Sequence, residues 1–367
     1  MAQLTEARVL DALRPIEDPD FKRSIVDLGF VKNLTIDGST VAFTIELTTP
    51  ACPVKEQFKR AAEEAVGALP GVDRVVVEMT ANTRGSRDAG KPTDILRDVR
   101  NVVAVASGKG GVGKSTVAAN LSLALARTGA KVGLLDVDVY GPSVPIMFGV
   151  SGRPRTTADR KIVPMEGHGL KLMSIGFVAG EDAPVIWRGP MVHSLVRQFL
   201  ADVEWGALDY LIIDMPPGTG DAALTLTQTA PLAGAVIVTT PQEVSLIDAR
   251  KGLKMFQRVH VPVLGIVENM SFFICDKCSA EHHIFGKGGA ARAAAELGVP
   301  VIGTVPLQSN VVTAGDTGVP IVLSDPESPA ARAFFELAGT VARKLALLHA
   351  EAPPVLDTNI TWVNTPG

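Results

Sequence analysis

SGKGGVGKST, at Ser107–Thr116, is the stretch that decides the fold of this chain. Val102–Ala106 before it contains only Val and Ala, which predicts a buried strand. Val117–Arg127 after it is dominated by Ala and Leu, and Gly129 follows, as is typical of a helix and its end. A strand, a glycine-rich loop and a helix in this order are the context that the pattern GxxxxGK(S/T) requires. The stretch therefore predicts a phosphate-binding loop; the alternative is a glycine-rich turn with a chance lysine.

The residue types of this loop suit a nucleoside triphosphate and its magnesium ion. Glycines leave the backbone N–H groups free to turn inward, and the start of the following helix adds the positive end of its dipole. We expect Lys114 to reach the β- and γ-phosphates, Ser115 to ligate Mg²⁺ and Thr116 to hold the α-phosphate. The expected ATP-binding residues are Gly108, Lys109, Gly110, Gly111, Val112, Gly113, Lys114, Ser115 and Thr116.

The chain after Asn101 alternates short apolar runs with helical stretches. This alternation predicts an α/β fold, with right-handed βαβ units around a doubly wound, mainly parallel sheet, which is the P-loop NTPase architecture. Ser328–Glu351 predicts a terminal amphipathic helix. The expected strands are Val102–Ala106, Val132–Leu135, Leu170–Ile175, Tyr210–Ile213, Ala235–Thr239, Val263–Val267 and Val301–Val305.

The first 80 residues predict a separate, small α+β domain. Asp37-Gly38 is a hairpin signal between two of its strands. Residues 81–98 are rich in polar residues and Gly, so we interpret them as a linker, with a long surface loop as the alternative. The NTPase domain is then expected over residues 99–352 and a tail over 353–367. The expected elements of the small domain are helices at Leu4–Leu13 and Pro53–Leu69 and strands at Phe30–Ile36, Val41–Leu47 and Val72–Met79.

The composition restricts the partners. Of the 367 residues, 46% are hydrophobic, enough for a sheet that is covered on both faces. A net charge of −4 argues against nucleic-acid binding as the main task, and no run of residues is apolar and long enough to span a bilayer. The N-terminal residues lack the apolar core of a targeting segment. We therefore expect a cytoplasmic protein with no membrane or nucleic-acid partner.

Two further predicted strands end in acidic residues. Leu134–Asp138 contains Asp136 and Asp138, and Leu211–Asp214 ends in Asp214. The carboxyl ends of the strands face the ligand site in a doubly wound sheet, where a carboxylate can hold Mg²⁺ or orient a water molecule. A helix cap is the ordinary alternative for an Asp after a strand. Two such acids together with a phosphate loop favour the nucleotide site.

Cys275 and Cys278 form a CxxC pair, which alone is compatible with zinc, an iron–sulfur cluster or a redox dithiol. Zinc and clusters usually need four ligands, so two cysteines per chain suggest that two chains share one centre on a symmetry axis. His282 and His283 follow at a spacing that does not fit a zinc finger, and we expect them on the surface. Cys52 stands apart, as either a reactive thiol near a helix start or a small buried hydrophobe.

The loop contains a second lysine, Lys109, and in this it resembles the loop of the deviant Walker A class of ATPases. That class includes the nitrogenase iron protein, the Min and Par positioning ATPases and the Mrp/ApbC iron–sulfur carriers. The resemblance narrows to the Mrp/ApbC family and covers nearly the whole chain up to the tail. The family often has CPxCG where this chain has Asp276 and Ser279, which affects the expected rigidity of the cysteine loop. The segments that carry the resemblance are Ser107–Thr116, Asp136–Ser143, Ile186–Pro190, Asp214–Asp221, Cys275–Cys278 and Ile284–Gly286, together with Thr48–Pro53, which resembles a small iron–sulfur assembly domain.

The resemblance implies roles at the nucleotide. Lys109 is expected to act across a homodimer interface on the partner's ATP, with a solvated loop lysine as the alternative. Asp138 is expected to position the attacking water and Asp214 to serve as the Walker B acid that holds Mg²⁺. Asn269 is expected to contact adenine, with a turn-forming Asn as the alternative. Gly218 and Asp221 are expected in the segment that senses the γ-phosphate, switch II; the expected catalytic residues are Lys109, Lys114 and Asp138.

The resemblance also implies a function. Cys275 and Cys278 of two chains are expected to hold a bridging 4Fe–4S cluster. The chain is then an ATP-hydrolysing carrier that works with cluster assembly factors and delivers clusters to apo-proteins. Two alternatives stay open at this point: a Min/Par-type positioning ATPase that cycles on membrane or DNA, and a zinc-stabilised regulatory dimer with slow ATPase activity.

Overall fold

The larger part of the molecule is built around one nine-stranded sheet. The structure is a computed structural model that describes residues 4–51, 54–83, 85, 95–139, 141–179, 189–275 and 277–351. The strands of the sheet are β6 (Val99–Ser107), β7 (Val132–Asp136), β8 (Met165–Gly167), β9 (Leu170–Ser174), β10 (Leu208–Asp214), β11 (Leu232–Thr239), β12 (Val263–Ile274), β13 (Glu281–His282) and β14 (Val301–Leu307). They run in the order β13-β12-β11-β6-β10-β7-β9-β8, with β14 paired to β12.

The sheet is mainly parallel, as predicted. The strand β6 lies at its centre and pairs in parallel with β10 and β11. Among the described strands of this sheet, only the short β8 and β13 pair antiparallel to their neighbours. The seven expected strands are all present, whereas β8 and β13 were not predicted. The strand β12 continues to Ile274 instead of ending at Val267, so it carries the chain directly to the cysteine pair.

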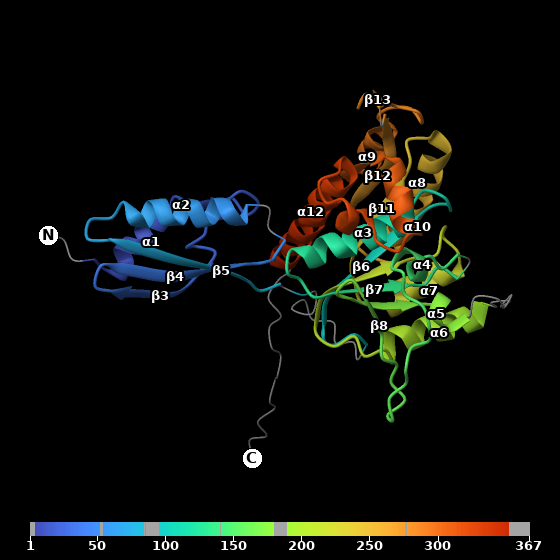
Figure 1. Cartoon of the computed structure of the whole chain (residues 1–367), viewed down its shortest axis with the longest axis horizontal. Coiled ribbons are helices and arrows are strands. Elements are labelled where there is room, and N and C mark those ends of the chain that lie inside the picture. The colour runs from blue at the N-terminus through green and yellow to red at the C-terminus, as the bar shows by residue number, and fades with distance from the viewer. Residues whose placement is uncertain are drawn as a thin grey trace, which may run out of the picture.

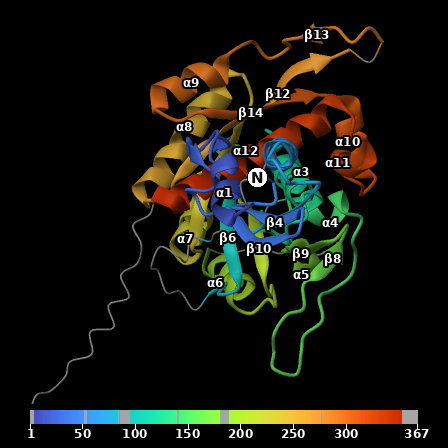
Figure 2. The same ribbon diagram turned by 90° about the vertical axis from the view of Figure 1, so that its left-hand side faces the viewer.

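Helices cover both faces of this sheet, which confirms the doubly wound α/β architecture. They are α3 (Lys114–Arg127), α4 (Val144–Met147), α5 (Gly176–Ala179), α6 (Gly189–Ala201), α7 (Asp221–Thr229), α8 (Glu243–Arg258), α9 (Gly289–Leu297), α10 (Ser309–Asp316), α11 (Ile321–Ser324) and α12 (Pro329–Glu351). Figure 2 shows α3, α10 and α11 on one side of the strands and α7, α8 and α9 on the other. Each face has its own buried apolar cluster, so apolar strand residues pack on both sides. No helix in the described part of the chain is both long and apolar enough to cross a membrane.

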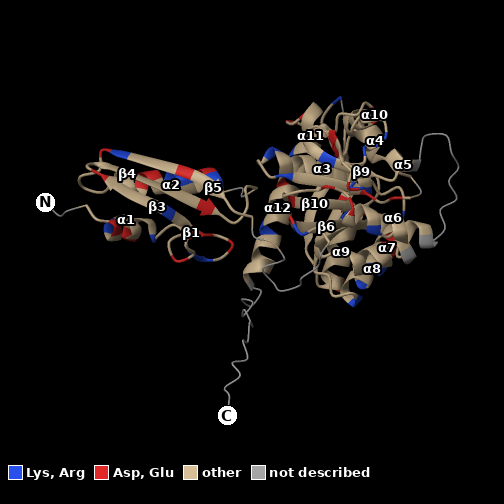
Figure 3. Cartoon of the chain, turned by 90° about the horizontal axis from the view of Figure 1, so that it is seen from below, with Lys and Arg blue, Asp and Glu red and all other residues tan. Residues whose placement is uncertain are grey.

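The small domain has its own sheet and core, and it extends to one side of the larger part in Figure 1. Its elements are α1 (Glu6–Leu13), β1 (Glu17–Asp18), β2 (Arg23–Ser24), β3 (Val31–Asp37), β4 (Thr40–Leu47), α2 (Lys55–Gly67) and β5 (Arg74–Ala81). The hairpin β3–β4 turns at Gly38, whose positive φ of 60° explains the glycine there. The pair β4–β5 is parallel, with α2 as its crossover. Figure 3 shows Lys and Arg interspersed with Asp and Glu over this domain.

Among the described residues, two polar contacts join the small domain to the larger part. The hydroxyls of Thr49 and Tyr210 lie 3.0 Å apart in a buried position, and Arg343 Nε lies 3.5 Å from Asp20 Oδ1. Ala51 belongs to the same apolar cluster as α3 and α12. Tyr210 is the third residue of β10, whose other end carries Asp214, so the small domain contacts the end of the sheet opposite the predicted nucleotide site. The described part of the predicted linker, in which Asn82 and Thr83 accept hydrogen bonds from Arg100, runs against β6.

Candidate nucleotide and cluster site

The phosphate loop joins β6 to α3 at the carboxyl edge of the sheet, the edge where doubly wound proteins bind ligands. Gly111 and Gly113 have φ angles of 78° and 80°, a conformation that favours glycine and lets successive N–H groups point to one side. Gly108 is required for another reason, since a Cβ there would overlap the backbone of Asp248 in α8. Gly110 has open space around it and no positive φ, so a larger residue should be tolerated better there than at Gly108, Gly111 or Gly113.

Lys114 lies buried at the start of α3 and bridges two of the predicted acids. Its Nζ lies 2.5 Å from Asp214 Oδ1 and 3.4 Å from Asp138 Oδ2. Burial lowers the pKa of Lys114, but the carboxylates of Asp214 and Asp138 more than offset this, and its pKa is raised overall. The lysine therefore stays charged, and it holds together two acids that the sequence separates by 76 residues.

Asp214 has a carboxylate oxygen that is available to coordinate a metal ion. Its carboxylate is fully buried, and burial raises its pKa while the Lys114 charge lowers it. The second oxygen, Oδ2, has no hydrogen-bond partner among the described residues, which is unusual for a buried oxygen. An unpaired carboxylate oxygen next to Ser115 is a donor set that suits Mg²⁺, so the residues present fit the expected ion.

Asp136 structures the turn after β7. Its Oδ1 accepts from the backbone N of Asp138 at 3.0 Å, and its Oδ2 accepts from Ser174 Oγ at 2.9 Å and from the backbone N of Val144 at 3.3 Å. Burial and the nearby Asp214 charge raise the pKa of Asp136 to about 7. Because both of its oxygens accept hydrogen bonds within this turn, Asp136 positions the segment that carries Asp138.

Asn269 contacts the phosphate loop itself, which was not predicted. Its Nδ2 donates to the Val112 carbonyl at 2.9 Å, so the side chain that was expected to meet adenine holds the phosphate loop. A hollow of about 300 Å³ adjoins it, on the side of α4 and α10. Asn269 can therefore line a nucleoside pocket while it supports the loop. The lining residues of this hollow include Thr116, Ile146, Asn269, Met270, Gln308 and Val312.

The loop after β10 touches the phosphate loop through Gly218. The backbone N of Gly218 donates to the Ser107 carbonyl at 2.9 Å, and Gly218 has a φ of 85°. The Lys109 side chain is half-buried, and the hydroxyl of Ser107 donates to the Lys109 carbonyl at 2.9 Å. Asp221 begins α7, although its side chain lies outside the described residues. Gly218 therefore contacts the phosphate loop. The role of Lys109 across a dimer interface stays a prediction.

The cysteine pair lies in a hairpin made by β12 and β13, which projects beyond the helices at the top of Figure 1. Cys275 is half-buried and Cys278 is exposed, and no disulfide joins them. The turn is closed by the backbone N of Ser279, which donates to the Cys275 carbonyl at 2.9 Å. Ser279 has a φ of 57°, so this Ser occupies a position at which Gly would be unstrained. Ser279, which stands where the family often has Gly, therefore adopts a strained backbone conformation.

The histidines near the pair are exposed, as expected, and stack on the hairpin. His283 lies edge-on to Phe272, and His282 is tilted over Phe273, at ring-centre distances of 6.1 and 6.4 Å. Among the described residues, no group of three or more His, Cys, Asp or Glu side chains is placed to hold a metal ion. The described part of one chain therefore offers two thiols, which is half of the usual ligand set of a cluster.

Sequence reasoning missed Glu268. This buried acid accepts from Ser271 Oγ at 2.5 Å and from the backbone N of Ala290 at 2.8 Å, and it ties β12 to the start of α9. An acid inside an otherwise apolar strand beside Asn269 was the available signal. The following residues singled out from the sequence lie outside the described residues: Cys52, Tyr140, Ile186, Trp187, Arg188 and Asp276.

Comparisons with known proteins show the family and the domains of the chain. The family model of the NUBPL iron-transfer P-loop NTPase matches residues 98–342, and the model of the iron-sulfur cluster assembly protein matches residues 6–79. An iron-sulfur cluster carrier protein of Synechocystis sp. is 52% identical over 94% of this chain and 99% of its own length. A protein of the same name from Deinococcus radiodurans is 46% identical over 92% of this chain and 95% of its own length.

Among solved structures, a nucleotide-binding protein from Archaeoglobus fulgidus in complex with ADP is 39% identical, with a TM-score of 0.58. The match covers 67% of this chain and 98% of that one. The matched fold and the loop geometry make the larger part of this chain a nucleotide-binding P-loop NTPase domain. The chain belongs to the family of NUBPL iron-transfer P-loop NTPases, as the resemblance to the Mrp/ApbC carriers predicted, with an iron-sulfur cluster assembly domain ahead of the NTPase domain.

Proposed function

We propose that this chain is an ATP-hydrolysing iron–sulfur cluster carrier, in which nucleotide and cluster are held by one continuous strand. The observation that carries the proposal is the course of β12. Asn269 on this strand holds the phosphate loop through Val112, and the same strand ends one residue before Cys275. The relatives from Synechocystis and Deinococcus are named iron-sulfur cluster carriers, which favours this hypothesis over a positioning ATPase.

The nucleotide chemistry uses the residues around Lys114. In the proposed mechanism Lys114 turns from Asp214 to the β- and γ-phosphates, and Asp214 is then free to hold Mg²⁺ together with Ser115. Bound Mg²⁺ would neutralise charge on the phosphates. We propose that Asp138, whose Oδ2 lies 3.4 Å from Lys114 Nζ, accepts a hydrogen bond from the attacking water. Lys109 of a second copy would stabilise the charge that develops in the transition state.

The cluster is the cargo of this cycle. Two thiols per chain lead us to propose a homodimer in which Cys275 and Cys278 of each copy bind one bridging 4Fe–4S cluster. Exposed apolar side chains support a second copy on the carboxyl edge, because they follow strand ends on the same edge as the phosphate loop. They are Ile146, Val244, Ile247, Ile284 and Val312, with exposed fractions between 46% and 65%. Recipients of the cluster would be apo-proteins.

Anaerobic reconstitution with iron and sulfide tests this proposal. We expect about four iron and four sulfide per two chains, with absorption in the visible range. The variant Cys275→Ala/Cys278→Ala should lose the cluster, and the matched control His282→Ala/His283→Ala should keep it. A double cysteine variant that holds a full cluster would refute the carrier hypothesis. Zinc instead of iron in the anaerobically purified protein would support a zinc-stabilised dimer.

A further inference from the structure

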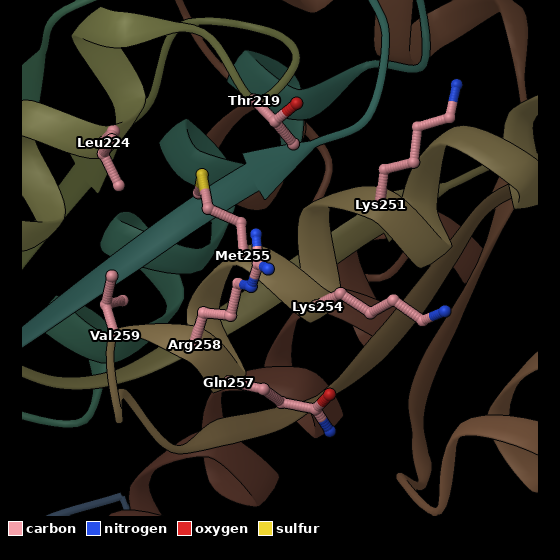
Figure 4. Close-up of a pocket in the computed structure, with 8 residues that line it drawn as sticks. All are labelled: Thr219, Leu224, Lys251, Lys254, Met255, Gln257, Arg258 and Val259. Carbon is pink, nitrogen blue, oxygen red and sulfur yellow. The ribbon is translucent and has the colours of Figure 1, made fainter.

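A second hollow, of about 760 Å³, lies between α8 and the segment after β10, and it contains none of the phosphate-loop residues. Its volume is within the range of ordinary ligand pockets. Figure 4 shows Lys251 and Lys254 extending along one side of it and Leu224 and Val259 on the other. The lining residues are Thr219, Leu224, Lys251, Lys254, Met255, Gln257, Arg258 and Val259.

Three cations line this hollow, and two of them have no matching acid among the described residues. Lys251, Lys254 and Arg258 follow one another at helical spacing, so they share one face of α8. Lys251 donates to Asp248 Oδ1 at 3.0 Å, whereas Lys254 and Arg258 form no ion pair with any residue that the structure describes. Both are exposed. The face therefore has two cations that are free to meet a negatively charged partner.

Arg250, a cation on the same helix outside the hollow, has acidic partners within the fold. Arg250 lies 2.7 Å from Glu296 of α9 and 3.8 Å from Glu243, so its charge is balanced within the fold. The charge of Arg250 is thus balanced where α8 meets α9, whereas two of the three cations that line the hollow, Lys254 and Arg258, have no ion-pair partner among the described residues. Arg258, in the last turn of α8, also favours the helix dipole, whereas Lys254 has no such role within the helix.

The floor of the hollow is apolar. Leu224 is 38% exposed, and Met255 and Val259 are half-buried between the charged side chains. Methionine adapts its shape to a partner at little cost. A ligand that fits this surface has both acidic groups and apolar side chains, as an amphipathic peptide segment has.

The walls of the hollow also touch the phosphate loop. Gly108 packs against the backbone of Asp248 and Ala249 in α8 so closely that a Cβ would overlap them. The segment that carries Thr219 contacts the loop through Gly218, whose N donates to Ser107 O. A partner that wedges between α8 and Thr219 therefore presses on two segments that hold the nucleotide site.

We propose that this hollow, the α8 groove, docks an acidic amphipathic segment of a partner protein and that docking changes the rate of nucleotide turnover. The effect on turnover rests on the proposed ATPase function, whereas the docking does not. Duplex DNA is the other polyanion to consider. Its affinity comes from many phosphate contacts, and two unpaired cations over an apolar floor, in a chain of net charge −4, favour the peptide.

A designed peptide tests the groove on the full-length chain. The probe is a fluorescent helical peptide of about 18 residues with Glu on one face and Leu on the other. We expect saturable binding to the wild type and a loss of at least tenfold in affinity for Lys254→Glu/Arg258→Glu. Lys131→Glu, an exposed charge reversal before β7, is the matched control and should bind as the wild type does. A peptide with Lys in place of Glu should not bind.

Each further outcome decides one part of the proposal. Equal binding to the double variant, no saturable binding, or tighter binding of duplex DNA that the same variant abolishes would overturn it. In ATP hydrolysis assays, saturating peptide should change kcat at least twofold in the wild type and leave the double variant unchanged, while the basal rates agree. An unchanged wild-type rate would refute the effect on turnover. A wild type without any ATPase activity but with groove-dependent binding would refute the proposed function and leave the docking intact.

Discussion

Lys114 Nζ lies 2.5 Å from Asp214 Oδ1, so the lysine of the phosphate loop neutralises the acid that ends β10. Both groups are buried, with Asp136 and Asp138 close by, so the pair lies within a cluster of three carboxylates and one cation. We therefore predict that ligand-free and ATP-bound forms differ at Lys114, because the proposed phosphate contact requires the same charge that the acids neutralise here.

Lys114→Met should disable the protein in two measurable ways. Removing one partner of a buried ion pair leaves an uncompensated carboxylate, which costs about 3 kcal/mol in the free energy of unfolding. Hydrolysis should be abolished because the phosphates lose their charge partner. Denaturant unfolding and phosphate release measure the two effects. Lys114→Met/Asp214→Asn is the control: it should regain much of the stability and none of the activity, and equal instability of both variants would contradict the pairing.

Two glycines of the same loop should behave differently on substitution. Gly108→Ala places a methyl group against the Asp248 backbone, which cannot move away easily, and should lower the free energy of unfolding by about 1–3 kcal/mol. Gly110→Ala meets open space and needs no unusual φ, so its stability should match the wild type within about 0.5 kcal/mol. Thermal unfolding without nucleotide makes the comparison. A similar loss in both variants would argue against the contact between the loop and α8.

The loop and the central strands were predictable because their signals are local. The pattern at Ser107–Thr116 and the apolar runs fix the strand–loop–helix unit without knowledge of distant residues. The α8 groove was not predictable, because Lys254 and Leu224 come to line one hollow only after α7 and α8 pack on the sheet. The antiparallel strands β8 and β13 were missed because each has only two or three residues and no periodicity of its own.

The site was only partly predictable for the same physical reason. Asp138 and Asp214 were expected near the nucleotide, and the structure brings both to Lys114. The Asn269 bond to Val112 joins positions 157 residues apart, and no local pattern specifies it. Whether Lys109 reaches a second copy depends on an assembly, which neither the sequence nor one chain contains.

Lys109→Ala should separate binding from turnover. Lys114 and the loop backbone remain, so ATP affinity should change by less than about fivefold. If Lys109 acts across the proposed dimer, kcat should fall by about 10³-fold, as for an arginine finger supplied in trans. Equilibrium binding of a fluorescent ATP analogue and steady-state hydrolysis give the two numbers. A kcat near that of the wild type would reject the role, and Lys131→Ala serves as the surface-lysine control.

Ser279→Gly should relax the cysteine turn. Ser279 has a φ of 57°, a conformation that costs a residue with a Cβ about 1 kcal/mol relative to Gly. The variant should therefore hold a reconstituted cluster longer in the presence of a chelator. The decay of visible absorption measures this. Ser151→Gly, at an exposed position without positive φ, is the control, and a decay rate of Ser279→Gly equal to that of the wild type would show that turn strain does not limit retention.

Tyr210→Phe should remove a pH dependence that belongs to the domain contact. Burial raises the pKa of Tyr210 from 10.0 to about 12, although its hydrogen bond with Thr49 lowers it in part. Between these pKa values the unfolded chain loses the phenol proton and the folded chain keeps it, so stability falls as pH rises from about 10 to about 12. The full effect of a two-unit shift is about 2–3 kcal/mol. Unfolding of wild type and Tyr210→Phe across this range should give a shallower slope for the variant. Thr49→Val, which keeps the phenol but removes its partner, should retain a pH dependence, whereas parallel curves for Tyr210→Phe and wild type would show that Tyr210 ionises equally in both states.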